Sequence, residues 1–194
     1  MPSLVSVALQ QQVAIITVNN PPVNALSTEV RAGLLNAIND AQLNQQVASI
    51  IIICEGRTFI AGADIKEFGH PPKAPHLPDL VLAIAYSVKP IIAALHGTVL
   101  GGGCEIALAC HYRVALEGTK IGLPEVNLGL IPGAGGTQLL PRLVGVAKAI
   151  EMIVSAKPII LPSTPDNILV HEVTDIDLLH STLKFAKNIK PAAV

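Results

Sequence analysis

Short apolar runs alternate with turns and glycine-containing loops along most of the chain. Residues 5–9 and 13–19 are rich in β-branched side chains, and Asn20-Pro21-Pro22 follows the second run, a pattern that predicts a hairpin of two strands. Ser27 is placed to cap a helix that reaches about residue 40. Residues 50–54 form a continuous apolar run, which is typical of a strand buried on both faces.

The second half of the chain repeats the order of strand, glycine loop and helix. The apolar run 91–95 predicts another buried strand, which leads through Gly101-Gly102-Gly103 into a helix that contains Glu105. Prolines between residues 157 and 166 exclude a regular helix there. The remaining predictions are a surface loop at 69–78, helices at 79–88, 135–144, 146–155 and 177–189, and short strands at 113–115 and 120–121. This order is typical of an α/β fold.

The composition indicates a folded domain and argues against several kinds of partner. With 194 residues, of which 51% are hydrophobic and 14% charged, the chain is long enough for a well-packed domain and too apolar for disorder. A net charge of -1 without a basic run argues against nucleic acid or an anionic membrane as a partner. No apolar stretch reaches the ~18 residues of a membrane helix, and neither end carries a targeting pattern, so a cytoplasmic location is expected.

Cysteines and histidines show no metal-ligand spacing, and we expect no metal site. Cys54, Cys104 and Cys110 lie in apolar runs without a CxxC pair, which predicts reduced core side chains. His96 and His111 each adjoin a predicted strand, which favours structural histidines over catalytic bases.

Two glutamates stand alone in stretches that are otherwise uncharged. Glu105 is the only Asp, Glu, Lys or Arg between Pro90 and Tyr112, and Glu125 is the only one between Ile121 and Pro141. The helix predicted around Glu105 is apolar on nearly all faces and therefore buried. Since an unpaired buried carboxylate costs several kcal/mol, these side chains are candidates for proton transfer.

Two glycine-containing segments stand out in the sequence, and one of them directly precedes the helix of Glu105. The segment Ala61-Gly62-Ala63 and the triplet Gly101-Gly102-Gly103 each follow a predicted strand, where backbone N–H groups are free of bulky neighbours. Two such N–H groups that meet at one point form an oxyanion hole. Together with two carboxyl groups, they suit proton transfer next to a carbonyl, or addition of water to a conjugated double bond.

A nucleotide site is the alternative explanation of the glycines. The triplet lacks the Lys-Ser/Thr pair of a P-loop, and Gln138 stands where the dinucleotide fingerprint requires its third glycine. Both nucleotide patterns are therefore excluded.

Three ordered motifs carry a resemblance to a known family: FIAGADIKEF (59–68), HGTVLGGGCEIALACHYRVA (96–115) and PEVNLGLIPGAGGTQLLPRLVG (124–145). They resemble the crotonase superfamily, and most of all the enoyl-CoA hydratase/isomerase domain of bifunctional fatty-acid oxidation enzymes. The resemblance implies a spiral of ββα units, with a catalytic core over residues 1–156 and a divergent tail over 157–194 that contains one helix.

The resemblance also implies a role for each candidate residue. Ala63 and Gly102 match the two amides of the oxyanion hole, and Glu105 and Glu125 match the two catalytic carboxylates. The substrate implied is a 2-trans-enoyl-CoA in fatty-acid oxidation, hydrated to a 3-hydroxyacyl-CoA without a further cofactor. The residues expected to contact the CoA handle or line the water pocket are Ala61, Ala63, Asp64, Ile65, Lys66 and Gly133; Lys66 is equally compatible with an ordinary surface lysine.

Alternatives remain open at this stage. The same glutamates could move a proton between C2 and C4, which is isomerase activity. The proline-rich tail departs from the family pattern, which leaves a CoA-binding scaffold without turnover as a rival. The family's common assemblies, a trimer or a dimer of trimers, are expected partners of the chain, as is a dehydrogenase domain if the chain belongs to a longer bifunctional protein, in which case the location would be peroxisomal in a eukaryote.

Overall fold

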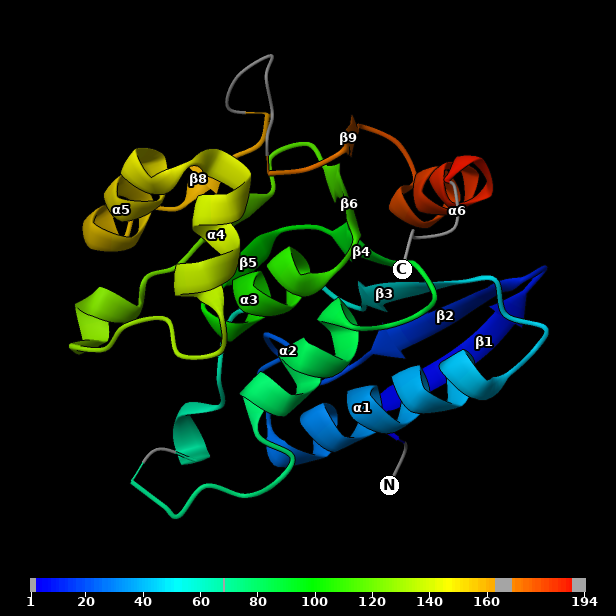
Figure 1. The fold of residues 1–194 in the computed structure, drawn as a ribbon, viewed down its shortest axis with the longest axis horizontal. Coiled ribbons are helices and arrows are strands. Elements are labelled where there is room, and N and C mark those ends of the chain that lie inside the picture. The colour runs from blue at the N-terminus through cyan, green and yellow to red at the C-terminus, as the bar shows by residue number, and fades with distance from the viewer. Residues whose placement is uncertain (1–2, 68, 163–168, 190–194) are drawn as a thin grey trace.

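The computed structural model describes residues 3–67, 69–162 and 169–189, and its main sheet has the strand order β1-β2-β3-β4-β6-β9 (Figure 1). Only the β1–β2 hairpin is antiparallel, and the other neighbours are parallel. The bounds are β1 Val5–Gln10, β2 Val13–Val18, β3 Ser49–Cys54, β4 Ile91–Leu95, β6 Tyr112–Leu116 and β9 Glu172–Thr174. The predicted hairpin and both buried strands are confirmed.

A second, smaller sheet lies beside the first. It contains β5 (Thr98–Leu100), β7 (Lys120–Gly122) and β8 (Ile159–Ile160); β5 and β7 are parallel, and β7 and β8 are antiparallel. The chain contains one unit twice: a strand of the main sheet, a strand of the small sheet and then a helix. The two copies are β4–β5–α3 and β6–β7–α4. This repeated unit places successive helices side by side, with α3 packed between α2 and α4.

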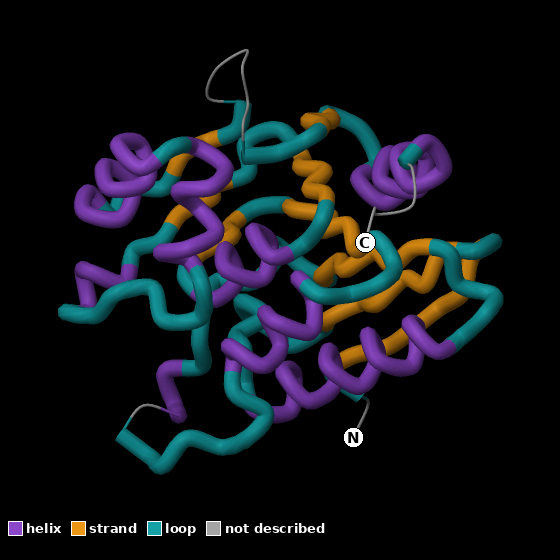
Figure 2. Tube along the Cα trace, viewed as in Figure 1, coloured by secondary structure: helices purple, strands orange, loops and turns teal. Residues whose placement is uncertain are grey.

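The helices lie close to their predicted positions (Figure 2). Their bounds are α1 Thr28–Leu43, α2 Leu77–Ala85, α3 Gly102–Ala109, α4 Gly136–Val144, α5 Val146–Ser155 and α6 Leu178–Asn188, with short 3-10 helices η1 (Ile65–Glu67) and η2 (Glu125–Leu128). Ser27 caps α1 as predicted, because its hydroxyl accepts a hydrogen bond from the Val30 N–H.

Helices cover both faces of the main sheet, which explains its uninterrupted apolar strands. Along β3, Ile50 and Ile52 pack in the same cluster as Leu34 of α1, whereas Ile51 packs in a second cluster with residues of α6. Figure 1 shows α1 and α2 on one side of the sheet and α6 on the other. Because successive side chains of a strand point to opposite faces, a strand covered on both faces, such as β4, needs apolar residues at every position.

Residues of the C-terminal tail join both sheets. β8 lies in the proline-containing segment, where a regular helix was excluded, and pairs with β7; residues 163–168 of the tail lie outside the described part. β9 extends the main sheet beside β6, and the predicted last helix is α6. No helix among the described residues is long and apolar enough to cross a membrane.

Candidate active site

The predicted catalytic residues meet at one cavity of about 400 Å³. It is lined from four separate stretches of chain: the segment before η1, the start of α2, the N-terminal half of α3, and the segment from η2 to α4. The lining residues are Ala61, Gly62, Ala63, Ile65, Leu77, Pro78, Gly101, Gly102, Glu105, Pro124, Glu125, Leu128, Leu130, Ile131, Gly133 and Ala134. Both glutamates and both candidate amides are therefore brought together.

Glu105 is held rigidly at the inner side of this cavity. The residue is 2% exposed, and its Oε1 accepts hydrogen bonds from the N–H groups of Ala134 at 2.7 Å and Gly136 at 2.9 Å. Burial raises the pKa of this carboxyl, and the two N–H donors act in the opposite direction. A side chain at Gly136 would displace the contact, because a Cβ there would lie 3.1 Å from Oε1 and 2.8 Å from the Pro132 Cβ.

Glu125 stands in a different environment at the start of η2. Its Oε2 is buried and has no hydrogen-bond partner among the described residues. Burial raises its pKa most, the charge of Glu105 raises it further, and its own backbone N–H lowers it. Both carboxyl groups line the same cavity, so a ligand bound there can meet both of them.

The two candidate amides lie on segments that meet at Leu26. The Leu26 N–H donates to the Gly62 carbonyl at 3.0 Å, and Leu26 bridges Ala63 in parallel. The Leu26 Cδ1 lies 3.0 Å from where a Cβ would stand at Gly102. Within the part of the chain that the structure covers, neither the Ala63 N–H nor the Gly102 N–H has an acceptor. Both groups are thus available to a ligand in the cavity.

The predicted contacts to the CoA handle separate into two groups. Ala61 and Ile65 line the cavity that holds both glutamates, whereas Asp64 and Lys66 line a neighbouring cavity of about 290 Å³. Asp64 closes a turn, because its Oδ1 accepts from the Lys66 N–H at 3.0 Å. The assignment of all these residues to CoA stays a prediction.

Several features of the site were not predicted. The N–H groups that hold Glu105 belong to Ala134 and Gly136, and a backbone amide has no signature in a sequence beyond the glycine-rich pattern around it. Leucine and isoleucine side chains at 77, 128, 130 and 131 give the cavity an apolar wall. The mixed sequence of the loop before α2 gave no sign that Leu77 faces the site.

The histidines and cysteines lie outside this cavity. The Nδ1 of His111 accepts from the Ile91 N–H at 3.1 Å, which is the structural role expected of it. The three cysteines are buried and unpaired, as predicted. No group of three or more metal-ligating side chains is found among the described residues.

Comparison with known proteins gives concordant matches. A family model described as enoyl-CoA hydratase/isomerase matches residues 8–192. A probable enoyl-CoA hydratase of Bacillus subtilis (strain 168) is 51% identical over 162 residues, which are 80% of this chain and 63% of that protein. A peroxisomal bifunctional enzyme of Danio rerio is 42% identical over 178 residues, 92% of this chain and 25% of the longer one.

A solved structure shows the same fold. The crystal structure of an enoyl-CoA hydratase from Bacillus anthracis matches with a TM-score of 0.89 and 32% identity, over 95% of this chain and 75% of that one. The likeness confirms the expected spiral α/β architecture. The chain spans less than two thirds of the Bacillus subtilis relative and a quarter of the bifunctional enzyme.

Proposed function

Because the chain belongs to the enoyl-CoA hydratase/isomerase family, we propose that it adds water across the double bond of a 2-trans-enoyl-CoA to give a 3-hydroxyacyl-CoA. One observation carries this proposal: two carboxyl groups with raised pKa line the same apolar cavity as two amide N–H groups that have no acceptor among the described residues. This set of groups suits addition to a double bond conjugated with a carbonyl.

The amides of Ala63 and Gly102 would bind the thioester oxygen, where negative charge develops as water attacks. The attacking water loses a proton to one carboxylate while its oxygen bonds to C3. The other carboxylic acid then gives a proton to C2, so that water has been added in total and both glutamates exchange protonation states.

The two glutamates differ in a way that favours one division of roles. Two N–H donors on the Oε1 of Glu105 stabilise its ionised form, which is the form of a base. The buried Oε2 of Glu125, which has no partner in the described part of the chain, favours the protonated form, which is the form of an acid. We therefore assign activation of water to Glu105 and protonation of C2 to Glu125.

Isomerisation is the second candidate function, and the same free oxygen supports it. With no water added, the Oε2 of Glu125 could take a proton from one carbon of a 3-enoyl-CoA and return it to another. Conversion of 3-enoyl-CoA into conjugated 2-enoyl-CoA, seen as a gain of absorbance, separates this activity from hydration. A scaffold without turnover would bind acyl-CoA and give neither signal.

The direct test follows the loss of the conjugated enoyl-thioester absorbance with crotonyl-CoA. Glu105→Gln and Glu125→Gln should each lower kcat by about 10²–10⁴-fold, the usual contribution of a general acid or base. Glu151→Gln, an exposed glutamate of α5 paired with Lys148, is the matched control and should retain parent activity. Parent-like rates in both cavity variants would refute the proposal.

Three other expectations from the resemblance stay predictions. They are a trimeric or hexameric assembly, a fused dehydrogenase domain if the chain is part of a longer protein, and a cytoplasmic or, in that longer eukaryotic form, peroxisomal location. Sedimentation analysis of the purified chain tests the assembly.

A further inference from the structure

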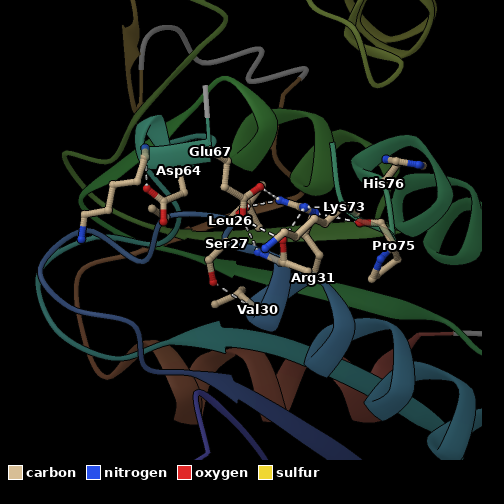
Figure 3. Close-up of polar contacts among 12 residues, drawn as sticks. Leu26, Ser27, Val30, Arg31, Asp64, Glu67, Lys73, Pro75 and His76 are labelled. Carbon is tan, nitrogen blue, oxygen red and sulfur yellow. Dashed lines mark hydrogen bonds and ion pairs between the residues drawn. The ribbon is translucent and has the colours of Figure 1, made fainter. Parts of the chain in front are cut away.

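A buried guanidinium on α1 donates hydrogen bonds from every one of its nitrogens. Arg31 of α1 is 7% exposed. Its Nε donates to the Pro75 carbonyl at 2.8 Å, its Nη1 to the Leu26 carbonyl at 2.6 Å and to the Glu67 Oε2 at 2.9 Å, and its Nη2 to the Thr28 Oγ1 at 3.2 Å and to the Lys73 carbonyl at 3.1 Å (Figure 3). One side chain therefore joins α1 to three other segments.

Glu67 fixes the first of these segments, η1. Its Oε2 pairs with Arg31, and its Oε1 accepts from the Thr28 N–H at 2.6 Å and the Thr28 hydroxyl at 2.8 Å. The carboxylate thus also binds the N-terminal end of α1, where the helix dipole favours negative charge. Because η1 directly follows the segment of Ala63, this anchor limits where that segment can lie.

Leu26 belongs to the second segment, which is hydrogen-bonded to Gly62 and packed against Gly102. Its carbonyl is held by Arg31, while its N–H donates to the carbonyl of Gly62, next to Ala63. Its side chain packs against Gly102. A shift of Leu26 would therefore move the two amides relative to each other.

The third segment leads into α2. The carbonyls of Lys73 and Pro75 that accept from Arg31 stand just before Leu77, the first residue of that helix. Leu77 lines the cavity, and its Cδ2 lies 2.6 Å from where a Cβ would stand at Gly102. Arg31 consequently restrains the segment that places Leu77 against Gly102 as well.

We propose that Arg31 is a positioning residue that holds the Ala63 and Gly102 amides at the spacing required to bind a thioester oxygen. The inference rests on the proposed function, since that oxygen belongs to its substrate. An oxyanion hole works only when its donors lie about 2.7–3.1 Å from the oxygen, and a misplacement of about 1 Å can lower a rate 10²-fold. Arginine suits this role because its planar fork binds several acceptors in fixed directions, whereas lysine offers one point charge.

The test compares Arg31→Lys with the parent and with Lys148→Met, which removes the exposed partner of Glu151 on α5. Arg31→Lys keeps a charge for Glu67 but cannot reach all the carbonyls, so kcat/KM for crotonyl-CoA should fall about 10–100-fold, in line with a misplacement of up to 1 Å. Lys148→Met should retain parent values. Circular dichroism and thermal melting establish that each protein is folded at the assay temperature.

A spectroscopic readout separates positioning from mere loss of stability. When a conjugated dienoyl thioester such as sorbyl-CoA binds to a Glu105→Gln protein, which cannot consume it quickly, hydrogen bonds to its oxygen shift its absorbance to longer wavelength. Adding Arg31→Lys to Glu105→Gln should reduce that shift, while the affinity for free CoA, which has no thioester oxygen, stays within about threefold, or about 0.65 kcal/mol.

The outcomes distinguish the two proposals. A parent without turnover, together with no spectral shift of sorbyl-CoA bound to Glu105→Gln, overturns the proposed function. Where turnover and shift are both present, a kcat/KM unchanged by Arg31→Lys and a shift unchanged when Arg31→Lys is added to Glu105→Gln overturn the positioning role. If Arg31→Lys does not fold, Glu67→Gln takes its place in the test, because glutamine keeps an acceptor for Thr28 but loses the negative charge that pairs with Arg31. A smaller spectral shift of bound sorbyl-CoA then supports the inference. An unchanged spectral shift refutes it.

Discussion

At the scale of single residues, chemically identical side chains acquire different roles from their surroundings. Glu105 and Glu125 are both withdrawn from water, which raises the pKa of each. Only Glu105 receives compensating N–H donors from another segment. The difference comes from the backbone of residues 134–136, so it is a property of the fold rather than of the glutamates.

The raised pKa of Glu105 has a consequence for stability that can be measured. Between the ordinary carboxyl value of about 4.3 and its raised value in the folded protein, the folded state binds more protons than the unfolded state, so stability falls as pH rises. Glu105→Gln removes this loss and keeps an oxygen for the two N–H donors. The variant should therefore unfold at higher urea concentration than the parent, by a margin that grows as the pH rises above about 4.3 and levels off once the raised pKa of Glu105 is passed.

The control for this measurement is Glu151→Gln on the exposed face of α5, for which the margin should not grow with pH. A constant difference between Glu105→Gln and the parent across the range would contradict the assigned burial effect. A gain in stability combined with lost turnover would show that the carboxylate is retained for chemistry.

Individual site residues could be predicted from the sequence where several features coincide in one motif. Isolation in apolar stretches marked Glu105 and Glu125, and both line the cavity. By contrast, Asp64 and Lys66 stand in the same motif as Ala63 but face a neighbouring cavity. Adjacent residues of a tight turn point in different directions, and a sequence motif does not record those directions.

At the scale of elements, glycines decide how closely α3 can approach its neighbours. A Cβ at Gly103 would lie 2.2 Å from the Ile60 carbonyl oxygen, which accepts from the Leu100 N–H. Gly103→Ala should lower the free energy of unfolding by about 1–3 kcal/mol, the usual cost of overpacking, and should lower turnover because α3 carries Glu105.

Gly133→Ala is the matched control for stability. Its nearest foreign heavy atom would be the Ile131 carbonyl oxygen at 3.9 Å, so its urea midpoint should correspond to a change within about 0.5 kcal/mol. Equal urea midpoints for Gly103→Ala and Gly133→Ala would show that the backbone at Gly103 shifts to accommodate the added methyl group. Close packing of α3 would then not be required for stability.

The sequence indicated long elements better than short ones. The strands over 50–54 and 91–95 were predictable because burial on both faces leaves an uninterrupted apolar run. β5 and β8 were missed, since runs of three and two residues have no detectable period and exist only because β7 lies beside them. Their position depends on contacts between segments far apart in the chain.

At the scale of the whole molecule, the tail is bound to α3, the helix that carries Glu105. Arg113 of β6 is 2% exposed. Its Nε donates to the Leu169 carbonyl at 2.7 Å, and its Nη1 donates to the carbonyls of Ala107 at 3.1 Å and Cys110 at 2.7 Å, at the C-terminal end of α3. The tail differs from the family pattern in sequence, yet it is attached at the opposite end of the helix that supplies Gly102 and Glu105.

The last helix, α6, closes the face of the main sheet that α1 and α2 leave open. It covers Ile51, Ile92 and Val114, each 0% exposed. Burial of such a side chain is worth about 1.5–3 kcal/mol, and a whole domain is stable by only about 5–15 kcal/mol. A chain that ends at residue 176 should therefore no longer unfold cooperatively in urea, and it should bind a dye that recognises exposed apolar surface. Lys184→Ala, a substitution on the exposed side of α6, is the control and should unfold like the parent. Cooperative unfolding of the shortened chain at the parent midpoint would show that the sheet holds without this cover, because the three side chains would then be exposed at no measurable cost.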